Sequence, residues 1–341
     1  MSRVLIIAEA GVNHNGDLAL ARKLVEAAAD AGADYVKFQT FKAENLVTKS
    51  AQKAAYQVKN VNDGDNSQFQ MLKNLEMPYE WHFELKDYAN SLGIKFLSTG
   101  FDEDSVDFLD ELGVDLFKIP SGEITNRSYL KHIASKGKEV IFSTGMANMK
   151  EVSDALDVFK QEGVHKDRIT ILHCNTEYPT PMKDVNLTAM NKIQEELGVK
   201  VGYSDHTLGI EVPIAAVALG AKVIEKHFTL DKNMSGPDHI ASLEPWELKN
   251  MIKSIRNIEL AMAGSGFKEP SLSEINNISI VRKSLYYKND LHCGHVINTH
   301  DLIALRPGSG VSPMQIELYI GKILNQNVDA FSMVGNNHFK W

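Results

Sequence analysis

The amino-acid sequence predicts an α/β protein, a TIM (β/α)8 barrel followed by a small β-rich domain. Short apolar, β-branched runs recur along most of the chain, each followed by an amphipathic segment or a loop, and the composition changes near residue 265. Such alternation indicates parallel strands joined by crossover helices. The expected strands are Val4–Ala8, Tyr35–Gln39, Lys95–Ser98, Leu116–Ile119, Glu139–Ser143, Ile169–His173, Lys200–Tyr203 and Lys222–Glu225.

The spacing of these eight runs favours a barrel over a doubly wound sheet. Most neighbouring runs lie about 20 to 30 residues apart, the length of one strand–helix unit. Eight such units end near residue 263, as a TIM barrel requires, whereas a doubly wound sheet rarely needs eight equal repeats. The segment after the first run has a helical apolar stripe, and Gly32 follows it as a stop signal. The stripe consists of Leu18, Ala21, Leu24, Val25 and Ala28.

The gap between the second and third runs is roughly twice as long as the others. Its extra portion, Lys49 to Gln70, is polar and contains Asn62, Gly64 and Asp65. We therefore expect a long loop over one end of the barrel.

The composition shift at Ala263-Gly-Ser-Gly-Phe267 predicts a linker. We expect a catalytic barrel over 1–265, a linker over 266–283 and a small domain over 284–341. The small domain should contain strand-like pieces at Ser284–Tyr287 and Val296–Ile297. Such a short unit has a thin core, so it is expected to lean on the barrel or on a second chain.

The amino-acid composition argues against several classes of function. The chain has 341 residues, 43% of them hydrophobic and 23% charged, and a formal net charge of −8, which gives no reason to expect a nucleic-acid partner. It contains no run of eighteen apolar residues, and its first residues lead directly into a strand without a signal peptide. The two cysteines, Cys174 and Cys293, lie far apart. These features predict a cytoplasmic protein without disulfides or a membrane partner.

Two histidines, His206 and His227, follow the seventh and eighth apolar runs. The carboxyl ends of barrel strands are where active sites form, so both imidazoles are expected at one mouth. Two neutral imidazoles on neighbouring strands could hold a divalent metal, with Glu225 and Asp238 as further ligands or orienting groups. The alternative is that both histidines only form hydrogen bonds inside the mouth.

Lysines and hydroxyls also follow the expected strands. Lys37 and Lys118 lie on the second and fourth strands, where a buried ammonium needs an anionic partner. Nearby hydroxyls and glycines suit phosphate, so we expect a phosphorylated or polycarboxylate substrate. The alternative is an internal salt bridge of each lysine with Glu9, Glu123 or Glu225.

Together these segments resemble the sialic acid synthase (N-acetylneuraminate synthase) family, which includes legionaminate and pseudaminate synthases. The resemblance runs from about residue 3 to about residue 325 and is highly specific. The C-terminal part, with Arg306-Pro-Gly, resembles the antifreeze-like (SAF) domain of that family. The motifs that carry the resemblance are Glu9-Ala-Gly-Val-Asn-His14-Asn-Gly, Val36-Lys-Phe-Gln-Thr40, Ile119-Pro-Ser-Gly-Glu123, Ser143-Thr-Gly-Met146, Leu172-His-Cys-Asn-Thr-Glu-Tyr-Pro179, Gly202-Tyr-Ser-Asp-His206-Thr, Glu225-Lys-His-Phe228 and Gly236-Pro-Asp238.

The resemblance implies condensation of phosphoenolpyruvate with an N-acetylated aminosugar in its aldehyde form. N-acetylmannosamine is the favoured sugar, and a 2,4-diacetamido-6-deoxy hexose, used by legionaminate or pseudaminate synthases, is the alternative. The implied catalytic residues are Glu9, Glu123 and Glu225. The implied phosphoenolpyruvate-binding residues are Lys37, Thr99, Lys118, Ser121, Ser143, Thr176 and Ser204.

By the same resemblance, Gln39, Tyr178, Asp238 and Arg306 contact the sugar. His206 and His227 hold a divalent metal, with Mn²⁺ expected and Mg²⁺ or Co²⁺ as alternatives. Arg306 is expected to reach the site from a second copy, which implies a domain-swapped homodimer.

Two positions depart from the family pattern, and three other functions fit the sequence less well. Gly100 stands where many members have proline, which implies a looser backbone beside Thr99, and Thr176 stands where some members have an asparagine that touches phosphate.

A synthase for phosphosugars would need further basic residues at the strand ends. A metal-dependent hydrolase usually carries His-x-His on its first strand, where this chain has Asn13-His14. A sugar- or ice-binding module would leave the polar strand ends without purpose.

Overall fold

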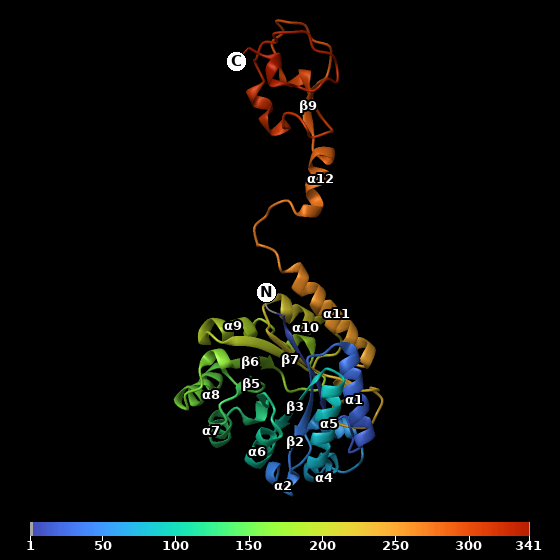
Figure 1. Cartoon of the computed structure of the whole chain (residues 1–341), viewed down its shortest axis with the longest axis vertical. Helices are drawn as coiled ribbons and strands as arrows, with labels where there is room; N and C mark the ends of the chain where they lie inside the picture. The colour runs from blue at the N-terminus through green and yellow to red at the C-terminus, as the bar shows by residue number, and fades with distance from the viewer. Residues whose placement is uncertain (1–2, 341) are drawn as a thin grey trace. The chain divides into compact units, whose positions relative to one another are not determined.

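The computed structural model describes residues 3–340, and the chain divides into two compact units, Met1–Ala263 and Gly264–Trp341. Within these residues the first unit contains eight strands, and the ladders between them are parallel. Their order is β3-β2-β1-β8-β7-β6-β5-β4, which makes a nearly closed barrel with β3 and β4 at its seam, as the sequence predicts for a TIM barrel (Figure 1). The strands are β1 (Leu5–Gly11), β2 (Tyr35–Thr40), β3 (Lys95–Gly100), β4 (Leu116–Ile119), β5 (Glu139–Ser143), β6 (Ile169–Cys174), β7 (Lys200–Asp205) and β8 (Val223–His227).

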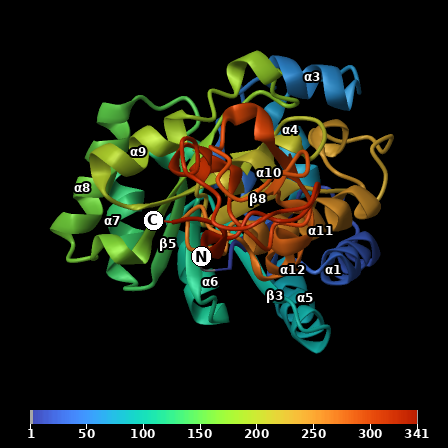
Figure 2. The same ribbon diagram turned by 90° about the horizontal axis from the view of Figure 1, so that it is seen from above.

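Helices surround this sheet on its outside (Figure 2). The helix predicted after the first strand is present as α1, capped by the Asp17 side chain at its start and by left-handed Gly32 at its end. Within the described residues no helix combines the length and the apolar character needed to cross a membrane. The outer helices are α1 (Leu18–Ala31), α5 (Tyr79–Ser91), α6 (Glu103–Leu112), α7 (Arg127–Ser135), α8 (Met149–Gln161), α9 (Ala189–Leu197), α10 (Glu211–Ala218) and α11 (Pro245–Ala261).

The segment between β2 and α5 differs from the predicted loop over Lys49–Gln70. It forms three short helices, α2 (Ala43–Leu46), α3 (Ala55–Val61) and α4 (Gln68–Leu75). The prediction of a loop was therefore wrong over much of this segment. Helices this short gain most of their stability from tertiary contacts, and a polar sequence does not reveal such contacts.

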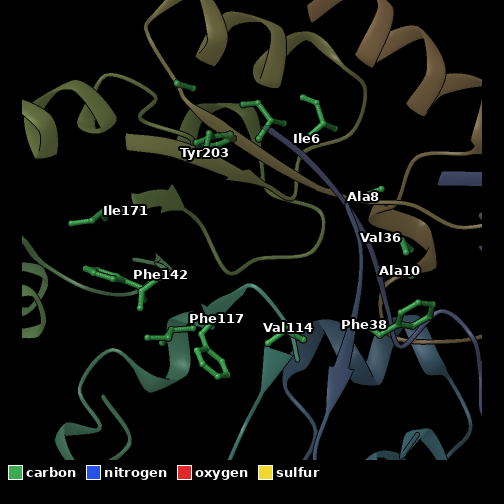
Figure 3. Close-up of a cluster of buried hydrophobic side chains, with 14 of the residues drawn as sticks. Ile6, Ala8, Ala10, Val36, Phe38, Val114, Phe117, Phe142, Ile171 and Tyr203 are labelled. Atoms are coloured by element: carbon green, nitrogen blue, oxygen red, sulfur yellow. The ribbon is translucent and has the colours of Figure 1, made fainter. Parts of the chain in front are cut away.

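Alternation along each strand divides the apolar residues into two layers. Side chains such as Ile6, Val36, Phe142 and Tyr203 form the large core that lies between the sheet and the helices (Figure 3). A smaller cluster comes from the alternate positions and fills the lower part of the barrel interior. It consists of Ile7, Tyr35, Leu97, Leu116, Ile141, Leu172 and Val223, with Leu5 packed against it.

The strands extend further than the apolar pattern indicates. All eight predicted strands are present, but β1 continues from Ala8 to Gly11 and β7 from Tyr203 to Asp205. In the added segments Glu9 and Ser204 face inward and line the site instead of the core. Gly202 is needed for close packing within the barrel, since a Cβ there would lie 2.3 Å from the carbonyl oxygen of Val223.

The second unit contains α12 (Leu272–Val281) and one antiparallel pair, β9 (Ser284–Tyr287) with β10 (Leu302–Leu305). Helix α12 lies inside the segment 266–283 that was predicted as a linker. Val296 forms only an isolated bridge with Ile323 instead of the expected strand. The unit has its own core of Leu285, Tyr287, Leu291, Ile297, Leu302, Tyr319, Leu324, Val328, Val334 and Phe339.

Candidate functional site

A cavity of about 610 Å³ opens at the carboxyl ends of the barrel strands. Every site residue predicted in the first unit lines it, so residues from far apart in the sequence meet there. Arg306 is exposed in the second unit, directly after β10. The predicted residues in the cavity are Glu9, Lys37, Gln39, Thr99, Lys118, Ser121, Glu123, Ser143, Thr176, Tyr178, Ser204, His206, Glu225, His227 and Asp238.

Two lysines and two carboxylates form a buried cluster at the floor of this cavity. Lys37 Nζ lies 2.7 Å from Glu9 Oε2 and 3.4 Å from Glu225 Oε2. Lys118 Nζ lies 3.4 Å from Glu225 Oε1. The internal salt bridges considered as an alternative are therefore present for both lysines. Their presence is compatible with anion binding, because a substrate can replace a carboxylate as the partner of an ammonium group.

Each lysine also donates a hydrogen bond to a hydroxyl on a neighbouring strand. Lys37 Nζ donates to Thr99 Oγ1 at 2.9 Å, and Lys118 Nζ donates to Ser143 Oγ at 2.8 Å. These bonds direct the ammonium groups toward the cavity wall formed by β3 and β5. Hydroxyls and ammonium groups at such spacing can donate together to phosphate or carboxylate oxygens.

Further hydroxyls complete the floor. Ser204 Oγ donates to Glu225 Oε1 at 2.8 Å, and Ser121 Oγ accepts from the backbone N–H of Gly145 at 2.9 Å. A Cβ on Gly145 would lie 2.4 Å from Thr176 Cγ2, so this position has no room for a side chain. The glycine therefore permits Thr176 to approach the Ser121 hydroxyl.

Gly100 is held in place at the end of β3. It pairs with Thr40, its carbonyl accepts a hydrogen bond from the Tyr129 hydroxyl, and a Cβ there would lie 3.1 Å from the backbone nitrogen of Val106. The strand is therefore supported on both sides where a looser backbone was expected beside Thr99.

The pKa values of the two carboxylates, Glu9 and Glu225, are shifted in opposite directions by burial and by neighbouring charges. Burial raises the pKa of Glu9 to about 7, against the opposing effect of Lys37. Burial also disfavours the ionised form of Glu225, but Lys118 and Lys37 outweigh it and hold the pKa of Glu225 below its ordinary value. Burial lowers the pKa of Lys118, whereas for Lys37 the two carboxylates overcome burial and raise the pKa. Glu225 is thus the permanent counter-ion, and Glu9 can exchange a proton near neutral pH.

The two predicted metal ligands lie side by side above this cluster. The ring centroids of His206 and His227 are 5.4 Å apart, and the Tyr178 ring stacks on His206 at 4.0 Å. His206 Nδ1 donates to the carbonyl oxygen of Asn175, which leaves Nε2 as the unprotonated nitrogen. Burial lowers the pKa of His206 to about 4 and that of His227 well below its ordinary value. Both rings are therefore neutral, the form that binds a metal.

The surroundings of His227 suit a metal ligand. Its Nδ1 is buried without a hydrogen-bond partner and lies 3.9 Å from Asp238 Oδ2. Within residues 3–340 no three His, Cys, Asp or Glu side chains are grouped as a complete metal site. The residues fit an ion that takes two imidazoles from the protein and its other ligands from substrate and water, as open catalytic sites do.

The predicted sugar-contacting residues lie around the histidines. Gln39 Nε2 is 3.5 Å from Glu9 Oε1, and Glu123 accepts a hydrogen bond from Asn126 at 2.7 Å. Burial raises the pKa of Asp238 to about 7 and that of Tyr178 well above its ordinary value. These groups offer both donors and acceptors to a polyhydroxylated ligand.

Sequence reasoning missed one wall of the cavity. That wall comes mostly from residues 46–75, of which Lys49–Gln70 were expected to be loop, and partly from Phe101. Helix α4 carried a detectable signal, since Gln68, Met71, Leu72 and Leu75 follow helical spacing directly after the N-cap Ser67. The missed residues are Leu46, Val47, Tyr56, Gln57, Gln68, Met71, Leu72, Leu75 and Phe101.

The chain is similar to several known synthases. The chain is 56% identical to N,N'-diacetyllegionaminic acid synthase of Campylobacter jejuni, over 96% of this chain and 97% of the relative. It is 53% identical to the N,N'-diacetyllegionaminic acid synthase of Legionella pneumophila, over 95% and 91%. The structure of N-acetylneuraminic acid (sialic acid) synthetase from Leptospira borgpetersenii superposes with a TM-score of 0.71 at 36% identity, covering 81% of this chain and 90% of the other. The NeuB family profile matches residues 24–268, and the chain therefore belongs to the NeuB family.

Proposed function

We propose that this enzyme condenses phosphoenolpyruvate with a 2,4-diacetamido-6-deoxy hexose to form a legionaminate-type nonulosonic acid and phosphate. The observation that carries the proposal is the convergence of two buried lysines and two neutral histidines on one cavity. The similarity to two diacetyllegionaminic acid synthases supports this sugar over N-acetylmannosamine, which the sequence alone favoured.

As a NeuB-family synthase the chain is a phosphoenolpyruvate-dependent enzyme that forms a carbon–carbon bond. Carbon 3 of phosphoenolpyruvate attacks the aldehyde carbon of the open-chain sugar, water adds at carbon 2, and phosphate leaves the resulting tetrahedral intermediate. In the proposed complex Lys37 and Lys118 bind the phosphate and carboxylate groups. Further donors in this subsite are the hydroxyls of Thr99, Ser121, Ser143, Thr176 and Ser204.

The three glutamates have different environments and therefore different proposed roles. Glu9 is the acid/base candidate, because burial places its pKa near neutrality, where proton transfer is most effective. Glu225 lies 3.4 Å from both lysines and favours their charged form. Glu123 is half-buried and lines the cavity, and its proposed role is to contact the sugar or to transfer a proton there.

We further propose that His206 and His227 bind a divalent ion, Mn²⁺ in the first instance and Mg²⁺ or Co²⁺ as alternatives. When bound, such an ion acts as a Lewis acid on the aldehyde oxygen. The chain itself keeps both imidazoles neutral and orients His206 through the carbonyl of Asn175. Gln39, Tyr178 and Asp238 hold the sugar beside them.

The second unit is proposed to act as an antifreeze-like domain that completes the site of another copy. Its Arg306 is exposed after β10, and the fork of a guanidinium group suits an amide oxygen of the sugar. A domain-swapped homodimer would bring this arginine to the neighbouring barrel. A cytoplasmic location belongs to the same proposal, since both cysteines are free.

Release of inorganic phosphate tests the proposal. Purified enzyme with Mn²⁺ and phosphoenolpyruvate receives either the diacetamido sugar or N-acetylmannosamine. We expect phosphate and a nonulosonic acid with the first sugar, with a higher kcat/KM than with the second. A higher kcat/KM for N-acetylmannosamine would identify a sialic acid synthase instead, and release of phosphate without any sugar would refute the condensation.

A further inference from the structure

The inserted helices of residues 43–75 form a wall across the mouth of the barrel. Asn60 Nδ2 donates to the carbonyl of Pro237 at 2.7 Å and lies 3.5 Å from that of Tyr178. The ring of Tyr56 stacks on Tyr178 with centroids 5.0 Å apart and planes at 21°. These contacts join helix α3 to the loops after β6 and β8. The inserted segment is therefore attached to the same loops that surround the histidines.

The insertion is also folded firmly in itself. The buried ammonium group of Lys53 lies 2.7 Å from Asp63 Oδ1 and donates to the carbonyl of Asp65 at 2.8 Å. Met71 and Leu75 of helix α4 pack in a small core with Val12. A wall held in this way can select between ligands, because it does not have to order itself on binding.

The face that this wall turns toward the cavity is largely apolar. Leu46, Val47, Leu72 and Phe101 are only partly buried, and they line the cavity together with the polar floor. Partly exposed leucine, valine and phenylalanine around one space indicate that an apolar group of the ligand is received there. The same cavity is also lined by the charged residues Glu9, Lys37, Lys118 and Glu225, so its apolar and charged surfaces suit different parts of the substrates.

Two amide side chains interrupt this apolar face. Gln57 Oε1 accepts from the backbone N–H of Ala54 at 2.9 Å and lies 3.5 Å from Gln68 Nε2. Both glutamines line the cavity. A primary amide offers a donor and an acceptor, the pair of groups that an acetamido substituent requires.

We propose that this wall determines which sugar is used, with the apolar side chains receiving carbon 6 as a methyl group and the glutamines receiving a second acetamido group. This inference rests on the proposed function. The charged floor holds phosphoenolpyruvate and the aldehyde carbon must meet it there. The distal carbons of an open-chain hexose then extend away from the floor, toward the wall. Leu72 and Gln68 are accordingly specificity-determining residues.

The same contacts disfavour N-acetylmannosamine for two reasons. Its carbon 6 carries a hydroxyl, which loses its water partners against an apolar wall. Its carbon 4 carries a hydroxyl instead of an acetamido group, so an amide of the wall is left without a partner. An apolar subsite discriminates about 10- to 200-fold per group, and a subsite that needs a hydrogen bond discriminates more strongly.

The test compares kcat/KM for the two sugars, with phosphoenolpyruvate and Mn²⁺ saturating, in the full-length enzyme. Gln68→Leu removes one amide, and Leu72→Asn offers the wall a polar partner. We expect each to lower the ratio of kcat/KM, diacetamido sugar over N-acetylmannosamine, about tenfold or more. Gln70→Leu and Val58→Asn are the matched controls, because Gln70 is exposed on α4, Val58 is exposed on α3, and neither residue lines the cavity. They should keep the wild-type ratio.

The outcomes separate this inference from the proposed function. If wild-type enzyme prefers the diacetamido sugar but Gln68→Leu and Leu72→Asn keep the wild-type ratio, the wall does not select the sugar and this inference is overturned alone. If wild-type enzyme condenses neither sugar or prefers N-acetylmannosamine, the proposed function is overturned and this inference with it. A KM for phosphoenolpyruvate within twofold of wild type shows that a variant has kept its folded floor, and having two variants guards against misfolding of one.

Discussion

Separating Asp205 from Lys226 should destabilise the barrel far more than breaking a surface ion pair. Both side chains are 0% exposed, and Nζ lies 2.6 Å from Oδ2. Thr207 donates its backbone N–H and its hydroxyl to the carboxylate at 3.0 and 3.1 Å, and the ammonium group donates to the carbonyl of Thr207. By alternation along β7 and β8, these side chains point away from the cavity that Ser204 and His227 line.

The contacts of Asp205 and Lys226 predict which variant loses more stability. Removing one partner of a buried pair costs about 3–5 kcal/mol, because the other charge is left uncompensated. Lys226→Met leaves the carboxylate with two hydrogen bonds from Thr207, whereas Asp205→Leu leaves the ammonium group with one carbonyl acceptor. We therefore expect Asp205→Leu to lose more stability than Lys226→Met. The double variant should lose less than the sum of both, since it buries no unpaired charge.

Thermal unfolding followed by circular dichroism measures these differences. A loss of 1 kcal/mol lowers Tm by about 2–4 °C in a domain of this size class, so each single variant should lose about 6 to 20 °C. Lys95→Met is the matched control, because the Lys95–Asp115 pair at 2.5 Å is 62% and 48% exposed. An exposed pair contributes about 1 kcal/mol or less. Single variants that match this control, or a double variant that loses the full sum, would refute the reasoning.

The remaining predictions address the site and the pH dependence. His206→Ala and His227→Ala should each abolish calorimetric Mn²⁺ binding and turnover with an unchanged circular dichroism spectrum, and full activity in EDTA would contradict this. Lys37→Met should raise KM for phosphoenolpyruvate far more than KM for the sugar, costing about 2–3 kcal/mol in kcat/KM; loss of soluble protein with normal kinetics in the remainder would favour a purely structural lysine. Arg306→Ala should weaken sugar binding alone, and mixing it with His227→Ala should restore up to about a quarter of the sites if the arginine acts in trans; no recovery after verified subunit exchange would exclude that. Burial lowers the pKa of His82 to about 4, below its unfolded value, so the unfolded chain binds the proton first and stability falls as pH drops from about 6.5 to 4. His82→Gln should therefore make Tm less dependent on pH in that window, and an unchanged dependence would argue against a neutral buried histidine.

The barrel and its floor could be predicted because one periodicity determines both. In β2 the inward positions are Tyr35, Lys37 and Gln39, so a single strand supplies a core residue, a floor cation and a proposed sugar contact in order. The apolar part of this pattern reveals the strand, and the polar part reveals the site once the strand direction is known. Strand ends were placed too early at β1 and β7 for the same reason, since the pattern changes from apolar to polar where the site begins.

The wall could not be predicted because its order depends on contacts distant in sequence. Helix α3 has no buried residue of its own, and its position follows from Asn60 and Tyr56 meeting the loops after β6 and β8. A polar seven-residue segment without those partners is not a stable helix, so local propensity gives no signal. The same limit applies to α12, which has no buried residue and lies where the composition suggested a linker.

The two proposals locate chemistry and sugar choice on different structural elements of the barrel mouth. The floor residues are fixed by the register of hydrogen-bonded strands, and their charges depend on one another, since Glu225 holds both Lys37 and Lys118. A substitution there disturbs the whole cluster. The wall lies between β2 and α5 in the sequence, and its separate side chains, such as Leu72 and Gln68, line the cavity. A substitution there changes one contact with the sugar and leaves the lysine–carboxylate cluster intact, so a barrel of this design can acquire a new sugar specificity without losing its reaction.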